Sequence, residues 1–163
     1  MRIIRRIKKY FWASVVCFVL NAACFLFMPY ATEQAEITNR TSLFVTGSAF
    51  WLTLLAGIVL LVFANLERRD FARTRLDGDY KMGSRVGIIT FFDNIPATVF
   101  DILMIVSAIA STILIITKRS NVQLTFIAIS ILVLSLNMHC LFNGRIYKST
   151  KYKRVRRDGR HAK

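Results

Sequence analysis

The chain has 163 residues, of which 55% are hydrophobic and 20% charged, and its formal net charge is +14. A mean hydropathy of +0.47 excludes a soluble globular domain of this length. The three cysteines do not form a disulfide framework, because Cys17 and Cys24 lie on one predicted helix, about 10 Å apart along its axis.

Four apolar runs of about 20 residues each dominate the sequence, and a helix of that length crosses a hydrocarbon core of about 30 Å. The runs cover residues 11–30, 44–65, 97–117 and 122–142. The sequence therefore predicts an all-α integral membrane protein, a four-transmembrane-helix bundle in which residues 1–163 form a single membrane domain.

The first run follows a basic segment and is interpreted as a retained anchor rather than a cleaved signal peptide. It is longer than the usual apolar core of a signal peptide. Its removal would leave three spans, and the basic segments that follow would then lie on opposite sides of the membrane.

The lysines and arginines predict the orientation of the four spans. Twenty of the 23 lie before the first span, between the second and third spans, or after the fourth. The opposite side holds only Arg40, Lys118 and Arg119. Because Lys and Arg resist translocation, both termini are predicted to be cytoplasmic, and the loops at 31–43 and 118–121 to face outward. The small outer loops favour a bacterial cytoplasmic membrane.

The connection between the second and third spans is predicted to have two parts. Charged residues 67–85 continue the second helix to a turn near Gly78. Apolar residues 86–95 form a short interfacial elbow helix, with Ile88, Phe91 and Phe92 in the lipid. Asn94, as a cap, and Pro96 separate the elbow from the third span. A re-entrant hairpin is the alternative interpretation of the elbow.

Two ionisable residues, Asp101 and His139, lie inside predicted spans. Each lies about 6 Å from the cytoplasmic end of its helix, and the short turn between the two helices makes them antiparallel neighbours. A contact between the two side chains is therefore predicted, since an ionisable group in a membrane normally finds a partner. A structural clamp, or an aspartate that reaches the headgroups, is the favoured interpretation. A proton-linked or cation-sensing pair is the alternative, because histidine titrates near neutral pH.

A layer of milder polarity lies near the middle of the spans and is expected to form hydrogen bonds between helices. It consists of Asn21, Thr53, Ser107 and Ser130, and Asn137 extends a polar stripe on the last helix. Helix packing is the favoured interpretation, and a polar pathway or a partner-helix interface is the alternative. The candidate intramembrane polar site comprises Asp101, His139, Asn137 and Asn21. No acidic residue lies at this middle level, which argues against a proton-coupled exporter.

Residues 143–163 form a basic cytoplasmic tail. Its part from Arg145 to Lys163 is predicted to be unfolded and held at anionic headgroups by charge, because it is strongly basic and nearly free of apolar residues. The candidate lipid contacts are Lys148, Lys151, Lys153, Arg154, Arg156 and Arg157. Nucleic acid or the ribosome is a less favoured partner, because no base-reading motif accompanies the charges.

Catalytic signatures are absent from the sequence: it has no Gly-rich phosphate loop, Cys-x-x-Cys pair or Gly-x-Ser-x-Gly elbow. The sequence therefore predicts no enzymatic activity, no cofactor and no metal. The favoured function is an accessory, scaffold or immunity-type membrane protein that acts through helix–helix contacts, with another membrane protein or with itself, and through a basic cytoplasmic face. The alternative is a small oligomeric transporter or channel subunit that uses Asp101, His139 and the mid-span polar residues.

Overall fold

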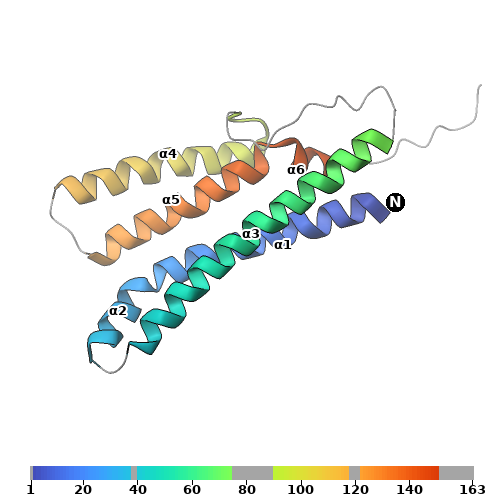
Figure 1. The fold of residues 1–163 in the computed structure, drawn as a ribbon. Coiled ribbons are helices and arrows are strands. Elements are labelled where there is room, and N and C mark those ends of the chain that lie inside the picture. The colour runs from blue at the N-terminus through green and yellow to red at the C-terminus, as the bar shows by residue number, and fades with distance from the viewer. Residues whose placement is uncertain (1, 38–39, 75–89, 118–121, 151–163) are drawn as a thin grey trace, which may run out of the picture.

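The computed structural model of the protein describes residues 2–37, 40–74, 90–117 and 122–150. These residues form helices and contain no strand (Figure 1). The helices are α1 (Arg2–Leu26), α2 (Met28–Ile37), α3 (Thr41–Thr74), α4 (Ile95–Ile116), α5 (Val122–Phe142) and α6 (Arg145–Thr150). Within the described ranges, α1, α3, α4 and α5 are each long and apolar enough to cross a membrane. The protein is therefore an all-α integral membrane protein, as the sequence predicts.

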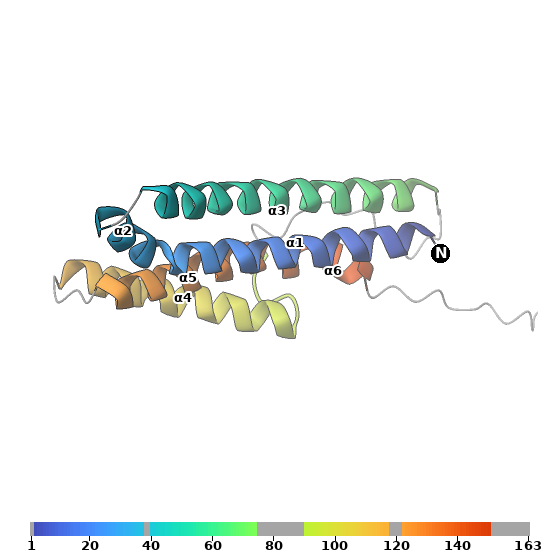
Figure 2. The same cartoon turned by 90° about the horizontal axis from the view of Figure 1, so that it is seen from below.

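The four long helices form a row in the order α3, α1, α5, α4. Helix α1 packs along both α3 and α5, and α5 packs along α4. Figure 2 shows α3 and α4 on opposite outer sides of the row. Of the 18 most apolar consecutive residues in each span, 28% are buried in α1 and 33% in α5, against 11% in α3 and 17% in α4. The inner helices therefore carry most of the core, and the outer helices expose most of their apolar surface.

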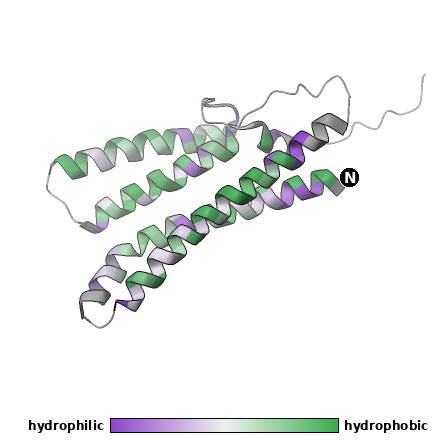
Figure 3. Ribbon diagram, in the orientation of Figure 1, coloured by the Kyte–Doolittle hydropathy of each residue, from purple (hydrophilic) through white to green (hydrophobic). Residues whose placement is uncertain are grey.

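One end of the row is basic, and we call it the basic end: α1 and α4 begin there, and α3 and α5 end there. Figure 3 shows hydrophilic residues on α1 and α3 at this end and mostly hydrophobic residues along the long helices. An aromatic cluster joins three helices near this end. Phe11 of α1 lies 5.5 Å from Phe142 of α5 and 5.7 Å from Tyr147 of α6, measured between ring centroids.

The first helix differs from the predicted span at 11–30, because it ends at Leu26 and a separate helix, α2, follows. Pro29 explains the break: its ring would clash with the carbonyl of Phe25 if α1 continued. Proline is tolerated in the first turn of a helix, and Pro29 is the second residue of α2. The prediction of a loop over 31–43 is therefore wrong at both ends: residues 31–37 are helical in α2, and α3 begins at Thr41.

A close contact joins α1 to α3. A Cβ atom on Gly57 would lie 2.6 Å from Cε1 of Phe18, so glycine leaves the space that this ring occupies. The hydroxyl of Ser14 donates to the carbonyl of Gly57 at 2.8 Å. Small residues and hydrogen bonds between helices are the usual means of association in a membrane. Helix α3 also continues past the apolar run to Thr74, as predicted, whereas its predicted end near Gly78 lies outside the described residues.

The elbow before α4 is not a helix over residues 90–94, and the remainder of the predicted elbow, 86–89, lies outside the described residues. Phe92 has a φ of 56°, in the left-handed region that a right-handed helix excludes. Asn94 caps α4, and its side chain accepts a hydrogen bond from the N–H of Ala97. The predicted break and cap at Asn94 are thus confirmed, and the predicted elbow helix is wrong for the described part.

The start of the basic tail is folded, contrary to the prediction of an unfolded tail. Residues Arg145–Thr150 form α6, in which Ile146 is 1% exposed and Tyr147 is 9% exposed. These two side chains and Thr150 are buried where α6 meets α1, α3 and α5. Two apolar residues suffice here because the surface that receives them is already formed by Phe11 and Phe142. Residues 151–163 lie outside the described part.

Candidate functional site: a buried polar clamp

Asp101 and His139 meet near the basic end of the α4–α5 hairpin. Nδ1 of His139 lies 2.6 Å from Oδ1 of Asp101, and the two side chains are 4% and 0% exposed, respectively. The contact follows from the antiparallel pairing of α4 with α5, which brings the second turn of α4 level with the last turn of α5. The structure therefore contains the contact that the matching depths predict.

Asn143 completes this group, and sequence reasoning missed it. Its Nδ2 donates to Oδ1 of Asp101 at 2.8 Å, and its Oδ1 accepts from the N–H of Asp93 at 3.2 Å. The sequence places Asn143 at the first position of the tail, outside the predicted fourth span. A usable signal was its spacing of four residues from His139, because positions i and i+4 share a helix face.

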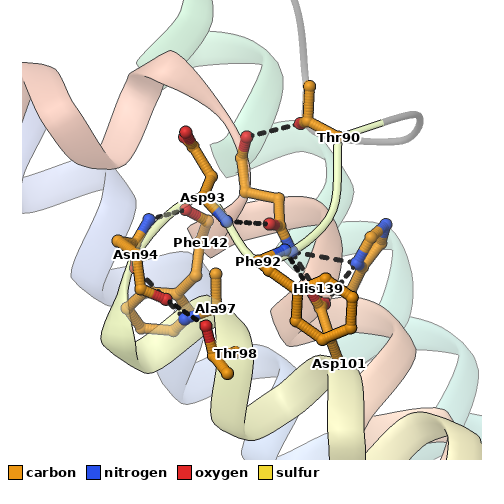
Figure 4. A network of polar contacts seen from close by, with 10 residues as sticks. Thr90, Phe92, Asp93, Asn94, Ala97, Thr98, Asp101, His139 and Phe142 are labelled. Carbon is orange, nitrogen blue, oxygen red and sulfur yellow. Dashed lines mark hydrogen bonds and ion pairs between the residues drawn. The ribbon is translucent and has the colours of Figure 1, made fainter.

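The elbow is held by the same group of side chains, as Figure 4 shows. The N–H of Phe92 donates to Oδ2 of Asp101 at 2.7 Å, and the ring of Phe91 lies 4.7 Å from the ring of His139. The carboxylate of Asp101 thus has three partners: a backbone N–H, an imidazole and an amide. We call Asp101, His139, Asn143 and the N–H groups of Phe92 and Asp93 the polar clamp.

The elbow also caps the end of α5. The amide of Asn94 donates to the carbonyl of Phe142 at 2.7 Å, and the hydroxyl of Thr90 donates to the carbonyl of Asn143 at 2.7 Å. The last carbonyls of a helix have no partner within the helix, so outside donors must satisfy them. The elbow supplies such donors, which ties the connection from α3 to the end of the α4–α5 hairpin.

The hydrogen bonds of Asn143 fix the orientation of its amide. The Oδ1 atom of Asn143 accepts from a backbone N–H, so its Nδ2 is the group that faces Asp101. Nδ1 of His139 lies 2.6 Å from Oδ1 of Asp101 and 2.9 Å from Nδ2 of Asn143, and the tautomer of the imidazole sets which of these contacts it makes as a donor.

The other two candidates for the intramembrane polar site, Asn21 and Asn137, make no hydrogen bond to the polar clamp within the described residues. Nδ2 of Asn21 donates to the carbonyl of Phe50 in α3 at 2.8 Å. Nδ2 of Asn137 is buried and has no hydrogen-bond partner in the described part of the chain. The structure therefore joins Asp101 to His139 and leaves Asn21 as part of the α1–α3 contact.

The mid-span hydroxyl groups differ from their predicted role. Thr53 donates to the carbonyl of Ala49 at 2.7 Å, and Ser107 donates to that of Leu103 at 2.6 Å, so both bond within their own helices. The hydroxyl of Ser130 is buried without a partner among the described residues. Of the predicted layer, only Asn21 makes a hydrogen bond between helices in the described part.

The candidate lipid contacts can be placed only in part. Lys148 of α6 is partly exposed, and its Nζ lies 2.7 Å from Oδ1 of Asp93, so it adds an ion pair beside the polar clamp. The other candidates lie outside the described residues: Lys151, Lys153, Arg154, Arg156 and Arg157. In the part of the chain that the structure describes, no group of three or more His, Cys, Asp or Glu side chains could hold a metal ion.

The fold and the polar clamp define an all-α integral membrane protein in which a short elbow is hydrogen-bonded to a helical hairpin. No protein-family model, curated protein sequence or solved structure matches the chain.

Proposed function

We propose that the protein is a non-enzymatic accessory or scaffold protein of the bacterial cytoplasmic membrane, with both termini in the cytoplasm. It acts through helix–helix contacts within the bilayer and through its basic cytoplasmic face. The observation that carries this proposal is the state of Asp101 and His139, which bind each other, Asn143 and the elbow. Their hydrogen bonds are used to hold the fold.

The position of the polar clamp supports a structural role for it. A carboxylate that carries an ion must exchange its partners and communicate with both sides of the membrane. Asp101 lies about 9 Å from the start of α4, near the basic end, and all three of its partners belong to the end of α5 or to the elbow. Removing any of these contacts would loosen the junction of α4, α5 and the elbow.

The outer helices offer the surface for partner helices. In the row, α3 and α4 each pack against one inner helix and leave their other faces uncovered. These faces carry large apolar side chains, among them Trp51, Leu55 and Val62 on α3 and Ile102, Ile109 and Ile113 on α4. Packing of apolar side chains drives helix association in lipid, so these two faces are where another membrane protein or a second copy would bind.

A transporter or channel subunit remains the second candidate, because one observation favours it. Helix α5 carries several buried polar atoms that have no hydrogen-bond partner among the described residues. They belong to Thr125, Ser130, Ser135 and Asn137. Polar atoms along one inner helix are what a pathway through the membrane would require.

A proton-flux assay separates the two proposals. The wild-type protein and the Asp101→Asn variant are reconstituted into vesicles that contain a pH-sensitive dye, and a pH gradient is imposed with valinomycin and potassium present. An accessory protein should leave the proton leak of both preparations equal to that of empty vesicles. Proton flux that the wild type supports and the variant lacks would overturn the accessory role and support the second candidate.

The partner surfaces are tested by cross-linking in native membranes. A photoreactive residue is placed in turn at Leu55 and Ile109 on the outer faces, and at the buried Leu61 as a control. The proposal predicts a protein adduct of discrete mass at Leu55 or Ile109 and none at Leu61. Adducts with lipid alone at both outer positions would contradict a role in helix–helix contacts.

A further inference from the structure

Arg68 is a charged residue near the end of α3 with almost no exposed surface, at 3%. It continues a buried stripe of α3 that is formed by Gly57, Leu61 and Ala64. At the basic end α3 packs against α1 and α6. At Gly57 this stripe meets Phe18 and Ser14 of α1, so Arg68 lies on the face of α3 that is turned toward α1.

The charge of Arg68 has no acidic partner among the described residues. Its Nε donates to the neutral Oδ1 of Asn65 at 3.3 Å. The acids whose side chains are described at this end are already paired: Glu67 with Arg6 at 3.4 Å, Asp93 with Lys148, and Asp101 with His139. A buried guanidinium without a counter-ion is strongly unfavourable, and arginine is rarely buried unless it is paired.

The level of Arg68 along α3 matches the level of lipid phosphates. The apolar run of this helix covers residues 44–65, and Arg68 lies about 20 Å from the middle of that run at 1.5 Å per residue. The hydrocarbon core extends about 15 Å from its centre, and the polar headgroup layer extends to about 22 Å. The guanidinium is therefore at the depth of the headgroups and not of the acyl chains.

We propose that Arg68 is the centre of a binding site for a phosphate-bearing anion, and that a phospholipid headgroup occupies it. The guanidinium has a planar set of donors that matches two phosphate oxygens, which a lysine ammonium cannot reproduce. The exposed cations Arg5 and Lys9 belong to the same end of α1 and add positive potential. This site differs from the predicted tail contacts, because it belongs to the folded helices and depends on one buried side chain.

The test measures thermal unfolding of the full-length protein in a neutral maltoside detergent, with added phosphatidylglycerol or phosphatidylcholine. The wild-type Tm should rise with phosphatidylglycerol by about 5–10 °C when the lipid is at about 100 times its Kd, and should not rise with phosphatidylcholine. Arg68→Gln should lose this rise. Arg69→Gln, which removes an exposed cation at the next position, should keep it.

A second variant keeps the test valid if Arg68→Gln does not fold. Arg68→Lys keeps the charge and should retain less than half of the rise in Tm, because the fork of donors is gone. A full rise in Arg68→Lys or in Arg68→Gln would overturn the site. Equal losses in Arg68→Gln and Arg69→Gln would also overturn it, because they would show a diffuse attraction to anionic lipid.

A further measurement identifies the source of the anion. Inorganic phosphate at 10 mM, compared with chloride at equal ionic strength, should not raise the Tm; a rise equal to that with phosphatidylglycerol would overturn the assignment to a lipid.

A last variant tests a protein counter-ion. The side chain of Asp70 lies outside the described part, so the Tm of Asp70→Asn is measured without lipid. A loss of Tm as large as that of Arg68→Gln would identify Asp70 as the counter-ion and overturn the proposal.

Discussion

The polar clamp gives the sharpest prediction, because one carboxylate joins three segments of the chain. In Asp101→Asn the side chain keeps its size, but one acceptor oxygen becomes an amide donor. That donor must face either the N–H of Phe92 or the Nδ2 donor of Asn143, both of which point at Asp101. Either orientation brings two donors together in a buried place.

The magnitude follows from the number and kind of contacts. A hydrogen bond to a charged group contributes about 1.5–3 kcal/mol, and the substitution weakens at least one such bond and leaves a donor unpaired. We therefore expect Asp101→Asn to lower the free energy of unfolding by about 3 kcal/mol. For a chain of this length, about 2–4 °C of Tm corresponds to each kcal/mol, so the Tm should fall by roughly 10 °C.

The assay is thermal unfolding in detergent of Asp101→Asn, His139→Gln and the double variant. Because both single changes remove the same contact, the double variant should be more stable than the sum of the single effects predicts, by at least about 1 kcal/mol. Asp93→Asn is the matched control from the same elbow. Its partly exposed pair with Lys148 should contribute less than about 1 kcal/mol. Single effects that add to within about 0.5 kcal/mol would refute the coupling.

Three further predictions test the packing, the cap and the orientation. Gly57→Ala should destabilise the protein by about 1–3 kcal/mol in thermal unfolding, because the new Cβ would lie 2.6 Å from the ring of Phe18. Gly47→Ala is the control, since nothing lies within 4 Å of its Cβ, and it should be neutral or stabilising. A larger loss of stability in Gly47→Ala than in Gly57→Ala would contradict the contact between α1 and α3. Asn94→Ala removes a helix cap and a donor to the end of α5, so it should lower the unfolding free energy by about 1–2 kcal/mol in chemical denaturation, and no change would show that the cap is dispensable. In a cysteine-free background, Ser42→Cys should react with an impermeant thiol reagent in intact cells and Ser149→Cys only after permeabilisation; the opposite pattern would refute cytoplasmic termini.

The sequence was sufficient for the features that depend on hydrophobicity and on local chemistry. The four membrane helices follow from the length of each apolar run, because a bilayer requires about 20 apolar residues in one helix. The capping role of Asn94 follows from its own side chain and the nearby proline. The contact of Asp101 with His139 was also predictable, because a short turn makes two helices antiparallel neighbours and so fixes which residues share a depth.

Other features depended on contacts between segments far apart in the chain. The elbow is not helical where it is described, because the N–H of Phe92 binds Asp101 and that of Asp93 binds Asn143. Residues 145–150 fold because Ile146 and Tyr147 meet a surface formed by other helices. No local pattern contains either surface, so hydropathy assigned the elbow to a helix and the start of the tail to an unfolded segment.

Apart from the pairing of α4 with α5, the order of the helices in the row was decided by tertiary structure alone. Membrane helices are apolar on every side, so hydrophobic periodicity does not say which face packs against a neighbour. Steric fit decides which faces pack together: the ring of Phe18 on α1 occupies the space that Gly57 leaves on α3. The same packing gives α1 and α5 a larger buried fraction than α3 and α4. The burial of Arg68 has the same origin: the sequence contains its charge and its depth, but only the packing of helices at the basic end removes it from solvent.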